Sequence, residues 1–277
     1  MPDKYAVFGN PVAHSRSPQI HRAFAAQTGD TIEYQRILVP EGKFRETARQ
    51  FLNGGGRGMN VTVPCKEEAF AFAGRLTPRA QRAGAVNTLK VDDDDTLLGD
   101  NTDGRGLLTD LADNLRWPLK GQRILLLGAG GAARGVLEPL LTQTPTVLVI
   151  GNRTESKAQS LAQSFGDLGH IQASSYEALA REQPFDLVIN ATSASLSGKL
   201  LPLPDSIIGG NSRCYDMLYG ARPTPFMDWA GERGVAQLAD GLGMLVEQAA
   251  ESFFLWRGKR PHTNAVIEAI RAELLGN

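Results

Sequence analysis

Short apolar runs alternate with helical patterns through the second half of the chain. Residues Ile124–Leu127, Val147–Ile150 and Leu187–Ile189 are apolar at successive positions, which is typical of strands buried on both faces. Between them, Ala132–Leu141 and Glu155–Phe165 carry the spacing of amphipathic helices. This alternation predicts a parallel β-sheet with helices on both sides.

The first half of the chain has a similar mixed pattern. Tyr5–Phe8, Ile32–Val39 and Met59–Val63 predict strands, and helices are expected to begin near Ser17–Pro18 and near Glu41. We expect the Ser17 hydroxyl to cap the first of these helices, because serine accepts a free backbone N–H and proline suits the first turn. A first α/β domain is therefore predicted ahead of the second.

Two further helical patterns, Met244–Trp256 and Thr263–Leu275, follow near the end of the chain, and we expect both to return to the first domain. The junction between the domains is predicted near Asn101–Gly106, ahead of another helix. The fold class is thus α/β with two α/β domains. The expected boundaries are residues 1–103 for the first domain, 104–239 for the second and 240–277 for the returning helices.

Composition narrows the classes of function. Lys and Arg number 29 against 30 Asp and Glu, so the net charge of −1 offers no basic field for a nucleic acid. The two cysteines, Cys65 and Cys214, are too few for a disulfide framework and lack C-x-x-C spacing, which favours the reducing cytoplasm. No apolar run approaches the ~18 residues of a membrane span, and we expect no targeting segment and no membrane partner.

The acidic run Asp92–Asp95 is the one feature of the sequence that suggests a cation. It lies between the strand patterns Thr88–Val91 and Thr96–Leu98, where a solvated hairpin turn is expected. A calcium loop needs spaced ligands and a later Glu, which are absent here, so no metal site is predicted.

A glycine-rich turn follows the strand Ile124–Leu127 and opens a helix. Gly128–Ala133 matches the G-x-G-x-x-A dinucleotide fingerprint in its required context. Glycines there let a pyrophosphate approach the N–H groups at the positive end of the helix. The alternative is a merely tight turn, which would not need three glycines. The second domain is therefore predicted to be of the Rossmann type, with these expected cofactor contacts: Gly128, Ala129, Gly130, Gly131 and Ala132.

The residue about 20 positions beyond this turn distinguishes the two nicotinamide cofactors, since NAD-binding proteins place an Asp or Glu there. This chain has Arg153 instead, within Asn152–Thr154. An arginine beside a helix start opposes the helix dipole unless an anion is present, so a 2′-phosphate explains it. The open alternative is a solvent-facing arginine beside a Thr154 cap. We predict NADP as the cofactor.

Hydride transfer to a ketone needs a proton donor for the developing alkoxide. Two polar segments, Asn60–Lys66 and Asn101–Gly104, follow predicted strands outside the cofactor domain and contain Lys66 and Asp103. Taken alone, Lys66 could be an ordinary residue at a helix start, and Asp103 could be a turn or cap residue.

Taken together, the motifs resemble those of the shikimate dehydrogenases over nearly the whole chain. In order they are Ser15-x-Ser17-Pro18, Asn60-Val61-Thr62-x-Pro64-x-Lys66, Gly84-Ala85-Val86-Asn87-Thr88, Asn101-Thr102-Asp103-Gly104, the glycine turn, Asn152-Arg153-Thr154, Asn190-Ala191-Thr192-Ser193, Asp216-Met217-x-Tyr219 and Gly241-Leu242-Gly243-Met244-Leu245-x-x-Gln248. The resemblance implies NADPH-dependent reduction of 3-dehydroshikimate to shikimate in the biosynthesis of aromatic amino acids.

The resemblance also implies a role for each matching residue. Ser15 and Ser17 would bind the substrate carboxylate through hydroxyls, without an arginine, although Ser17 could serve only as a cap. Lys66 and Asp103 look like the catalytic pair, and which of them releases the proton is left open. The other expected substrate contacts are Asn60, Thr62, Asn87, Tyr219 and Gln248, and the further cofactor contacts are Asn152, Arg153, Thr154, Thr192, Ser193, Met217, Gly241 and Met244. For Gln248 the alternative is a solvated helix position, and for the two methionines it is core packing.

Two positions depart from the family pattern. Ser195 stands where glycine is usual, which puts the local loop geometry in question, and Cys65 stands where an aromatic is frequent, which we expect to change only packing beside Lys66. Two other functions stay open: an NAD-dependent quinate/shikimate dehydrogenase, and a noncatalytic dinucleotide-sensing regulator. Either a monomer or a homodimer is compatible with the sequence.

Overall fold

The computed structural model describes residues 2–194 and 198–276, and the prediction of an α/β fold is confirmed. The chain divides into two compact units. Residues 1–106 and 246–268 form the first unit, and residues 107–245 and 269–277 form the second, so the chain leaves the first unit within one helix and returns to it within another. These divisions lie a few residues beyond the expected boundaries, and the last nine residues group with the second unit.

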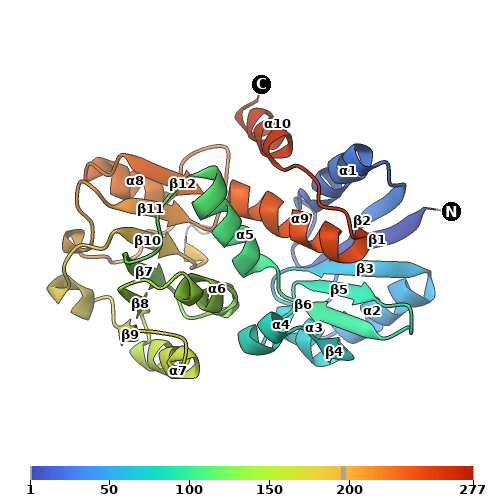
Figure 1. Cartoon of the computed structure of the whole chain (residues 1–277), viewed down its shortest axis with the longest axis horizontal. Coiled ribbons are helices and arrows are strands. Elements are labelled where there is room, and N and C mark those ends of the chain that lie inside the picture. Colours follow the sequence, from blue (N-terminus) through green and yellow to red (C-terminus); the bar gives the residue numbers. More distant parts are fainter. Residues whose placement is uncertain (1, 195–197, 277) are drawn as a thin grey trace. The chain divides into compact units, whose positions relative to one another are not determined.

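The first unit contains a mixed sheet in the order β2-β1-β3-β5-β6-β4 (Figure 1). Its strands are β1 (Asp3–Gly9), β2 (Ile32–Leu38), β3 (Gly56–Val61), β4 (Arg75–Leu76), β5 (Thr88–Val91) and β6 (Leu97–Asp100), and its helices are α1 (Ser17–Thr28), α2 (Phe44–Asn53), α3 (Lys66–Phe72), α4 (Pro78–Ala83), the start of α5 (Asp103–Thr109), most of α9 (Leu242–Arg257) and the start of α10 (Asn264–Leu275). Strands β1, β2 and β3 pair in parallel, whereas β5 is antiparallel to both β3 and β6.

Both faces of this sheet are buried, which explains the continuous apolar run in β1. Ala6 and Phe8 pack with residues of α2 and α3 on one face. Tyr5 and Val7 belong to the opposite face, where Tyr5 stacks on Trp256 of α9 at 4.5 Å between ring centroids. Side chains alternate across a strand, so a strand covered on both sides needs apolar residues at every position.

The second unit contains a parallel sheet in the order β12-β11-β10-β7-β8-β9. Its strands are β7 (Arg123–Leu127), β8 (Val147–Gly151), β9 (Ile171–Ser174), β10 (Leu187–Asn190), β11 (Arg213–Asp216) and β12 (Gln237–Asp240), and its helices are the end of α5 with a π-helical turn (Asp110–Asn114), α6 (Gly131–Thr142), α7 (Glu155–Phe165), α8 (Pro225–Glu232) and two 3-10 turns (Ala178–Arg181 and Asp205–Ile207). In chain order from β7 this is the doubly wound arrangement 3-2-1-4-5-6, which reverses direction between β7 and β10.

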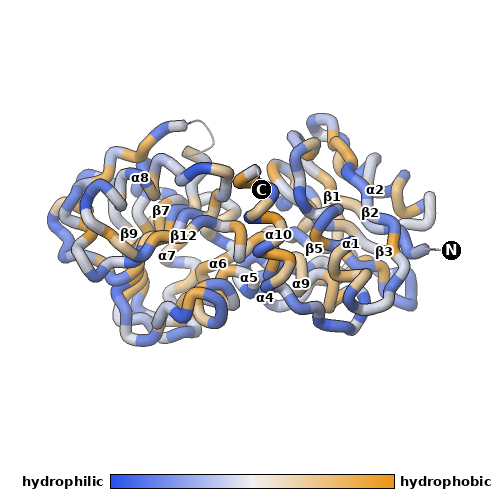
Figure 2. The backbone as a smooth tube through the Cα atoms, turned by 90° about the horizontal axis from the view of Figure 1, so that it is seen from above, coloured by the Kyte–Doolittle hydropathy of each residue, from blue (hydrophilic) through white to orange (hydrophobic). Residues whose placement is uncertain are grey.

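Apolar side chains fill both faces of the second sheet. Helices α6 and α7 cover one face, and α8 with the two 3-10 turns covers the other. Figure 2 shows the hydrophobic stretches inside the units and hydrophilic colour along many of the connecting loops. Within the described ranges, no helix is both long enough and apolar enough to cross a lipid bilayer.

Some predicted element ends were wrong. The strand expected at Met59–Val63 runs from Gly56 to Val61, because a turn follows in which the Cys65 N–H donates to the Thr62 carbonyl at 2.9 Å. The helix expected after the junction at Asn101–Gly106 begins within that junction, at Asp103.

The expected Ser17 cap was also wrong. Helix α1 begins at Ser17 itself, and Arg16, which occupies the cap position, makes no side-chain capping bond. The Ser17 N–H instead donates to the hydroxyl of Ser15 at 3.3 Å.

Candidate active site

Lys66 and Asp103 form an ion pair in the first unit. Lys66 is the first residue of α3, after the turn that follows β3, and Asp103 is the first residue of α5, after the loop that follows β6. Their side chains are 20% and 9% exposed. An ammonium has three N–H donors, so this pairing leaves donors for a bound molecule.

Asn87 holds the carboxylate of this pair. Its side-chain nitrogen donates to Asp103 Oδ1 at 2.7 Å, while its oxygen accepts from the Thr102 N–H at 2.9 Å and from the Thr88 hydroxyl at 2.9 Å. Asn87 is only 3% exposed. Its amide is therefore oriented by the protein, with the nitrogen directed at Asp103.

Gln248 reaches the same place from helix α9. Its Oε1 lies 3.3 Å from Asn87 Nδ2 and 3.4 Å from the Thr102 hydroxyl. Gly106 of α5 allows this approach, because a Cβ added there would lie 2.7 Å from the backbone nitrogen of Gln248. Gln248 thus occupies a polar cluster rather than a solvated helix position.

Asn60, at the end of β3, lies in the same polar cluster. Its Oδ1 accepts from the Tyr34 hydroxyl at 2.7 Å, and its Nδ2 donates to Ser252 Oγ at 3.0 Å and to Thr88 Oγ1 at 3.2 Å. His21 stacks on the Tyr34 ring at 4.5 Å, and burial lowers the pKa of His21 to about 3, against a hydrogen bond with Asn60 that raises it. The stacked, uncharged rings of His21 and Tyr34 therefore hold the Asn60 side chain in place through the Tyr34 hydroxyl.

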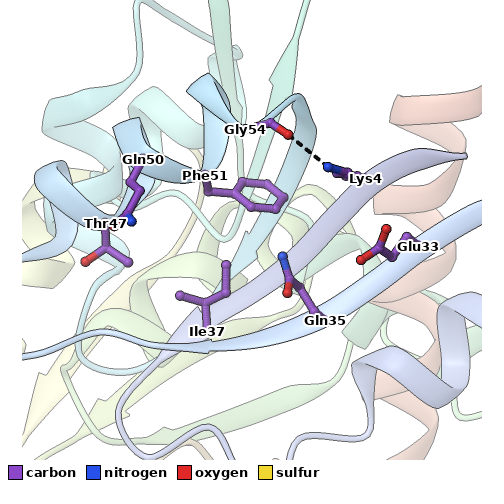
Figure 3. A pocket seen from close by; sticks show the side chains of 8 residues that line it. All are labelled: Lys4, Glu33, Gln35, Ile37, Thr47, Gln50, Phe51 and Gly54. Carbon is purple, nitrogen blue, oxygen red and sulfur yellow. Dashed lines mark hydrogen bonds between the residues drawn. The ribbon is translucent and has the colours of Figure 1, made fainter. Parts of the chain in front are cut away.

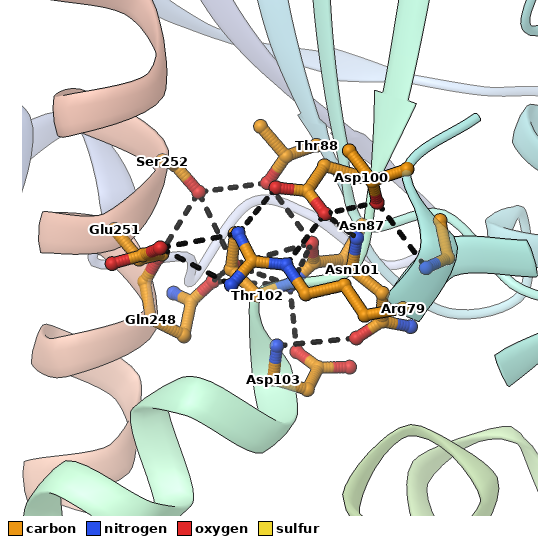
Figure 4. Close-up of polar contacts among 12 residues, drawn as sticks. Arg79, Asn87, Thr88, Asp100, Asn101, Thr102, Asp103, Gln248, Glu251 and Ser252 are labelled. Carbon is orange, nitrogen blue, oxygen red and sulfur yellow. Dashed lines mark hydrogen bonds and ion pairs between the residues drawn. The ribbon is translucent and has the colours of Figure 1, made fainter. Parts of the chain in front are cut away.

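A buried ion network anchors the loop that carries Asp103 (Figure 4). Arg79 of α4 bonds to both carboxylate oxygens of Asp100 and, at 3.1 Å, to Glu251 of α9. Asp100 is fully buried and accepts the Asn101 N–H, while the Asn101 oxygen accepts the Asp103 N–H at 3.2 Å. Arg79 therefore links α4, β6 and α9, and Asp100 and Asn101 connect this network to Asp103 at the start of α5.

Ser15, Ser17 and Thr62 lie on the loops that follow β1 and β3. The Ser15 hydroxyl donates to Ser17 Oγ at 3.1 Å, and Ser17 is also hydrogen-bonded to Tyr34. The Thr62 N–H donates to the Phe8 carbonyl at 2.9 Å, and its methyl group requires glycine at position 9, where a Cβ would come within 2.4 Å. These three hydroxyl residues therefore belong to neighbouring ends of parallel strands.

The glycine turn lies at the reversal point of the second sheet. Gly128 has φ +107°, and an added Cβ would lie 3.1 Å from Thr192 Cγ2 of the loop after β10. Gly130 and Gly131 have no atom within 4 Å of an added Cβ, and no side chain caps helix α6. The absence of side chains at 130 and 131 leaves open space beside free N–H groups, which is where a phosphate binds.

Arg153 is exposed between β8 and α7. Asn152 Nδ2 donates to the Thr154 carbonyl at 2.8 Å, which shapes the turn. Thr154 occupies the cap position of α7, but its side chain makes no capping bond. A second exposed cation, Lys157, stands in the first turn of α7, so two cations oppose the helix dipole here.

Asn190 and Asp216 organise the ends of β10 and β11. Asn190 Oδ1 accepts from the Thr192 hydroxyl at 2.7 Å, and its Nδ2 donates to Asp216 at 3.1 Å. Asp216 also accepts from Thr224 and from the Leu218 N–H. Thr192 is partly buried beside the glycine turn, and Ser193 is exposed.

Met217, Tyr219, Gly241 and Met244 lie beyond β11 and β12. Met244 is 7% exposed and packs in the core, and Met217 packs partly against it. Gly241 is required by the backbone, because a Cβ there would lie 2.2 Å from the Met217 carbonyl oxygen. Tyr219 is partly buried on the same segment.

Cys65 and Ser195 are the two departures from the family pattern, and the structure describes the first of them. Cys65 is buried in the first core, and burial, with a smaller contribution from Glu68, raises the pKa of its thiol to about 11. The loop question raised for Ser195 lies outside the described residues.

A hollow of about 290 Å³ lies elsewhere in the first unit, beside β1, β2 and α2 (Figure 3). Lys4 on its rim donates to the Gly54 carbonyl at 3.0 Å, and Phe51 forms part of the wall. None of the predicted site residues lines it.

Sequence reasoning missed the residues that support the site. Tyr34, Arg79 and Ser252 bond to predicted site residues or to their loop, but each lies in a different segment of the chain. Their separations in sequence, such as 192 residues between Asn60 and Ser252, carried no signal. Only the position of Asp100, directly before the Asn101-Thr102-Asp103-Gly104 motif, could have indicated a buried acid in need of a partner.

Two features define a dinucleotide-dependent oxidoreductase. One is the doubly wound sheet with a glycine turn at its reversal point, and the other is the Lys–Asp pair of the first unit, which an amide holds in place. Residues 7–89 match the family model of the shikimate dehydrogenase substrate binding domain, residues 110–197 that of shikimate / quinate 5-dehydrogenase, and residues 241–271 that of the shikimate 5'-dehydrogenase C-terminal domain. The chain belongs to the shikimate dehydrogenase family, as the motifs predicted.

Curated relatives and solved structures agree with this assignment. The shikimate dehydrogenases (NADP(+)) of Cellvibrio japonicus and Nitrosospira multiformis are 56% and 57% identical over 274 residues, and each alignment covers 99% of both chains. Shikimate 5-dehydrogenase from Thermus thermophilus, solved in complex with NADP(H) and shikimate, has a TM-score of 0.86 at 35% identity and covers 98% of this chain and 100% of its own. Shikimate dehydrogenase from Aquifex aeolicus has a TM-score of 0.87 at 30% identity, with 98% of each chain covered.

Proposed function

We propose that the protein catalyses the reversible, NADPH-dependent reduction of 3-dehydroshikimate to shikimate in the biosynthesis of aromatic amino acids. The observation that carries this proposal is the Lys66–Asp103 pair held by Asn87, in a chain that belongs to this family. A regulator that only senses a dinucleotide has no need of a proton-transfer pair.

The residues present fit NADP. Gly130 and Gly131 leave room beside the uncapped start of α6 for a pyrophosphate. Arg153 and Lys157 at the start of α7 would hold the 2′-phosphate, since a charge-assisted contact offsets their unfavourable position at the positive end of a helix. Thr192, on the loop beside Gly128, would contact the cofactor where it crosses the edge of the sheet.

The substrate would be bound by the polar cluster of the first unit. Ser15 and Ser17 donate hydroxyl hydrogens to its carboxylate, while Asn60, Thr62 and Gln248 contact its ring hydroxyls. The amide nitrogens of Asn60 and Asn87 are already engaged by the protein, and the Asn60 oxygen already accepts from the Tyr34 hydroxyl. We therefore expect Asn60 to offer the second lone pair of its oxygen to a substrate hydroxyl. Tyr219, Met217, Gly241 and Met244 are proposed to complete the substrate and nicotinamide contacts.

NADPH, when bound, supplies the hydride that the ketone carbon accepts. Lys66 donates an Nζ–H to the carbonyl oxygen and stabilises its developing negative charge. Asp103 keeps the ammonium in place, and Asn87 keeps Asp103 in place. The proton that completes the new hydroxyl comes from the Lys66–Asp103 pair.

The direct test measures the absorbance of reduced cofactor when the purified protein is mixed with shikimate or quinate and with NADP or NAD. We expect the highest kcat/KM with shikimate and NADP. A preference for quinate and NAD would identify the quinate/shikimate dehydrogenase instead. No reduction of either cofactor by either acid would support the noncatalytic regulator and contradict the proposal.

We also propose that the protein works in the cytoplasm as a monomer or homodimer. Cys65 and Cys214 are both buried and unpaired, which suits a reducing compartment. Sedimentation equilibrium at micromolar concentration distinguishes the monomer from the dimer.

A further inference from the structure

Arg36 of β2 lies beside the serine turn that is proposed to bind the substrate carboxylate. Its Nε and Nη2 donate to the Ser15 carbonyl oxygen at 2.9 and 2.7 Å. The two residues are 21 positions apart, and β2 forms an outer strand of the first sheet. The guanidinium of Arg36 therefore binds the Ser15 carbonyl oxygen through two N–H groups.

These two hydrogen bonds fix the backbone from which the hydroxyls of Ser15 and Ser17 project. The Ser15 N–H donates to Val12 at 3.0 Å, so both backbone polar groups of Ser15 are fixed. Its hydroxyl then donates to Ser17 Oγ and accepts the Ser17 N–H. With the backbone held, only rotation about the side-chain bonds of the serines is needed for both hydroxyls to turn toward an anion.

Arg36 also brings an exposed positive charge. None of the ion pairs formed among residues 2–194 and 198–276 includes its guanidinium. Arg16, which lies between the two serines in the chain, donates to Gln19 of α1 at 3.3 Å. Two serine hydroxyls are neutral donors, so on their own they discriminate weakly between an ionised carboxylate and a neutral ester.

We propose that Arg36 is a positioning and specificity-determining residue, which holds the Ser15–Ser17 turn and selects the ionised carboxylate of the substrate. The inference rests on the proposed function, which assigns this turn to the carboxylate. For charges separated by roughly 6 Å at an effective dielectric of about 40 to 80, the attraction between a guanidinium and a carboxylate corresponds to about a 3- to 10-fold gain in affinity. The family resemblance implies a carboxylate bound through the two serine hydroxyls without an arginine, whereas Arg36 reaches the serine turn from a strand 21 positions away in the chain.

The test compares shikimate with its uncharged methyl ester in Arg36→Gln and Arg36→Lys, at low and high salt. For Arg36→Gln we expect KM for shikimate to rise about 3- to 10-fold with kcat within about twofold, while KM for the ester rises much less. Arg36→Lys should keep most of the preference for the acid. The KM of the unaltered enzyme for shikimate should rise with salt more steeply than that of Arg36→Gln, because salt screens the charge. Arg57→Gln, an exposed arginine of β3, is the matched control and should change none of these values.

Two results would overturn the proposal. An equal rise in KM for acid and ester in Arg36→Gln would leave only a structural clamp, and an unchanged KM for both would remove Arg36 from the site. Ser15→Ala and Ser17→Ala separate this from a failure of the proposed function. If both leave the KM for shikimate unchanged, the carboxylate subsite itself is misplaced. If both raise it while Arg36→Gln does not, only the role of Arg36 fails.

Discussion

At the scale of single residues, the site depends on side chains that hydrogen-bond to one another. Asp103 accepts from Lys66 on one oxygen and from Asn87 on the other. The start of α5 also favours a negative charge at this position. Such mutual bonding lowers the cost of holding Lys66 and Asp103 in one geometry before a substrate arrives.

Replacement of the lysine should therefore affect the chemical step more than binding. We expect Lys66→Ala to lower kcat by about 10²-fold or more, with a smaller change in KM, because the developing alkoxide loses its donor. Steady-state kinetics with shikimate and NADP measure both constants. Lys43→Ala removes an exposed lysine that pairs with Glu46 on the surface, and it should leave kcat unchanged. Full turnover by Lys66→Ala would exclude this lysine from the mechanism.

Arg153 provides a second prediction at this scale. Hydrogen bonds to charged groups contribute about 1.5 to 3 kcal/mol, so Arg153→Ala should weaken NADP binding about 10- to 100-fold. NAD lacks the 2′-phosphate, and its affinity should stay unchanged, which makes it the internal control. Titration of both cofactors by calorimetry gives the two dissociation constants. Equal weakening for NAD and NADP would mean that Arg153 contacts some other part of the cofactor.

At the scale of elements, the junction between the π-helical turn Asp110–Asn114 and helix α9 is tightly packed. Asp110 is buried and accepts from the Tyr215 hydroxyl at 2.6 Å and from Asn114 at 3.0 Å. Burial raises the pKa of Asp110, and these two hydrogen bonds act in the opposite direction. The carboxylate lies so close to α9 that a Cβ on Gly243 would come within 1.9 Å of it. The second glycine of the Gly-Leu-Gly-Met motif is therefore explained by packing.

Gly243→Ala should lower the free energy of unfolding by about 1 to 3 kcal/mol, the usual cost of overpacking. The penalty should shrink in an Asp110→Ala background, where the obstructing carboxylate is gone. Urea unfolding of the four proteins of this double-mutant cycle measures the coupling between the positions. If the alanine cost as much in both backgrounds, the clash with Asp110 would not be its cause.

At the scale of the whole molecule, the chain closes its first unit with residues from both ends. Arg257 at the end of α9 bonds to Asp3 of β1 and, at 2.8 Å, to Asp30 after α1. Thr28 and Lys259 also donate to Asp30, at 2.6 and 3.1 Å. Burial disfavours the ionised form of Asp30, but these hydrogen bonds outweigh it and lower its pKa to about 2.

This closure should depend on pH in a defined direction. A carboxylate with a lowered folded-state pKa stabilises the protein above its unfolded value of 3.8, and the contribution is lost as the pH falls toward 2. Asp30→Asn should therefore cost about 2 kcal/mol at neutral pH, and the difference from the unaltered protein should narrow below about pH 4. Urea unfolding between pH 7 and 3 follows both proteins. Asp93→Asn, in the exposed hairpin turn, is the control and should differ little at any pH. A gap that stayed constant down to pH 3 would contradict this account.

The sequence by itself determined the strands, the helices that follow them and the motifs at their ends. Continuous apolar runs such as Ile124–Leu127 and the glycine turn at Gly128 carry their signal within a few residues, because burial on both faces and the approach of a phosphate each impose a local pattern. The pairing of Lys66 with Asp103 was expected from matching motifs. The fold class and the family were therefore accessible from the chain alone.

Only the tertiary structure decided which polar groups support those motifs. Strand order and helix packing bring together residues that are far apart in the sequence and therefore share no local pattern. The hydrogen-bonded pairs formed in this way are Tyr34 with Asn60, Arg79 with Asp100, and Arg36 with Ser15. Helix ends such as Ser17 were misjudged for the same reason, since a hydroxyl bonds to whichever partner the fold brings nearest. A hydrogen bond depends on a separation of about 3 Å in space and not on the number of residues between its partners in the sequence.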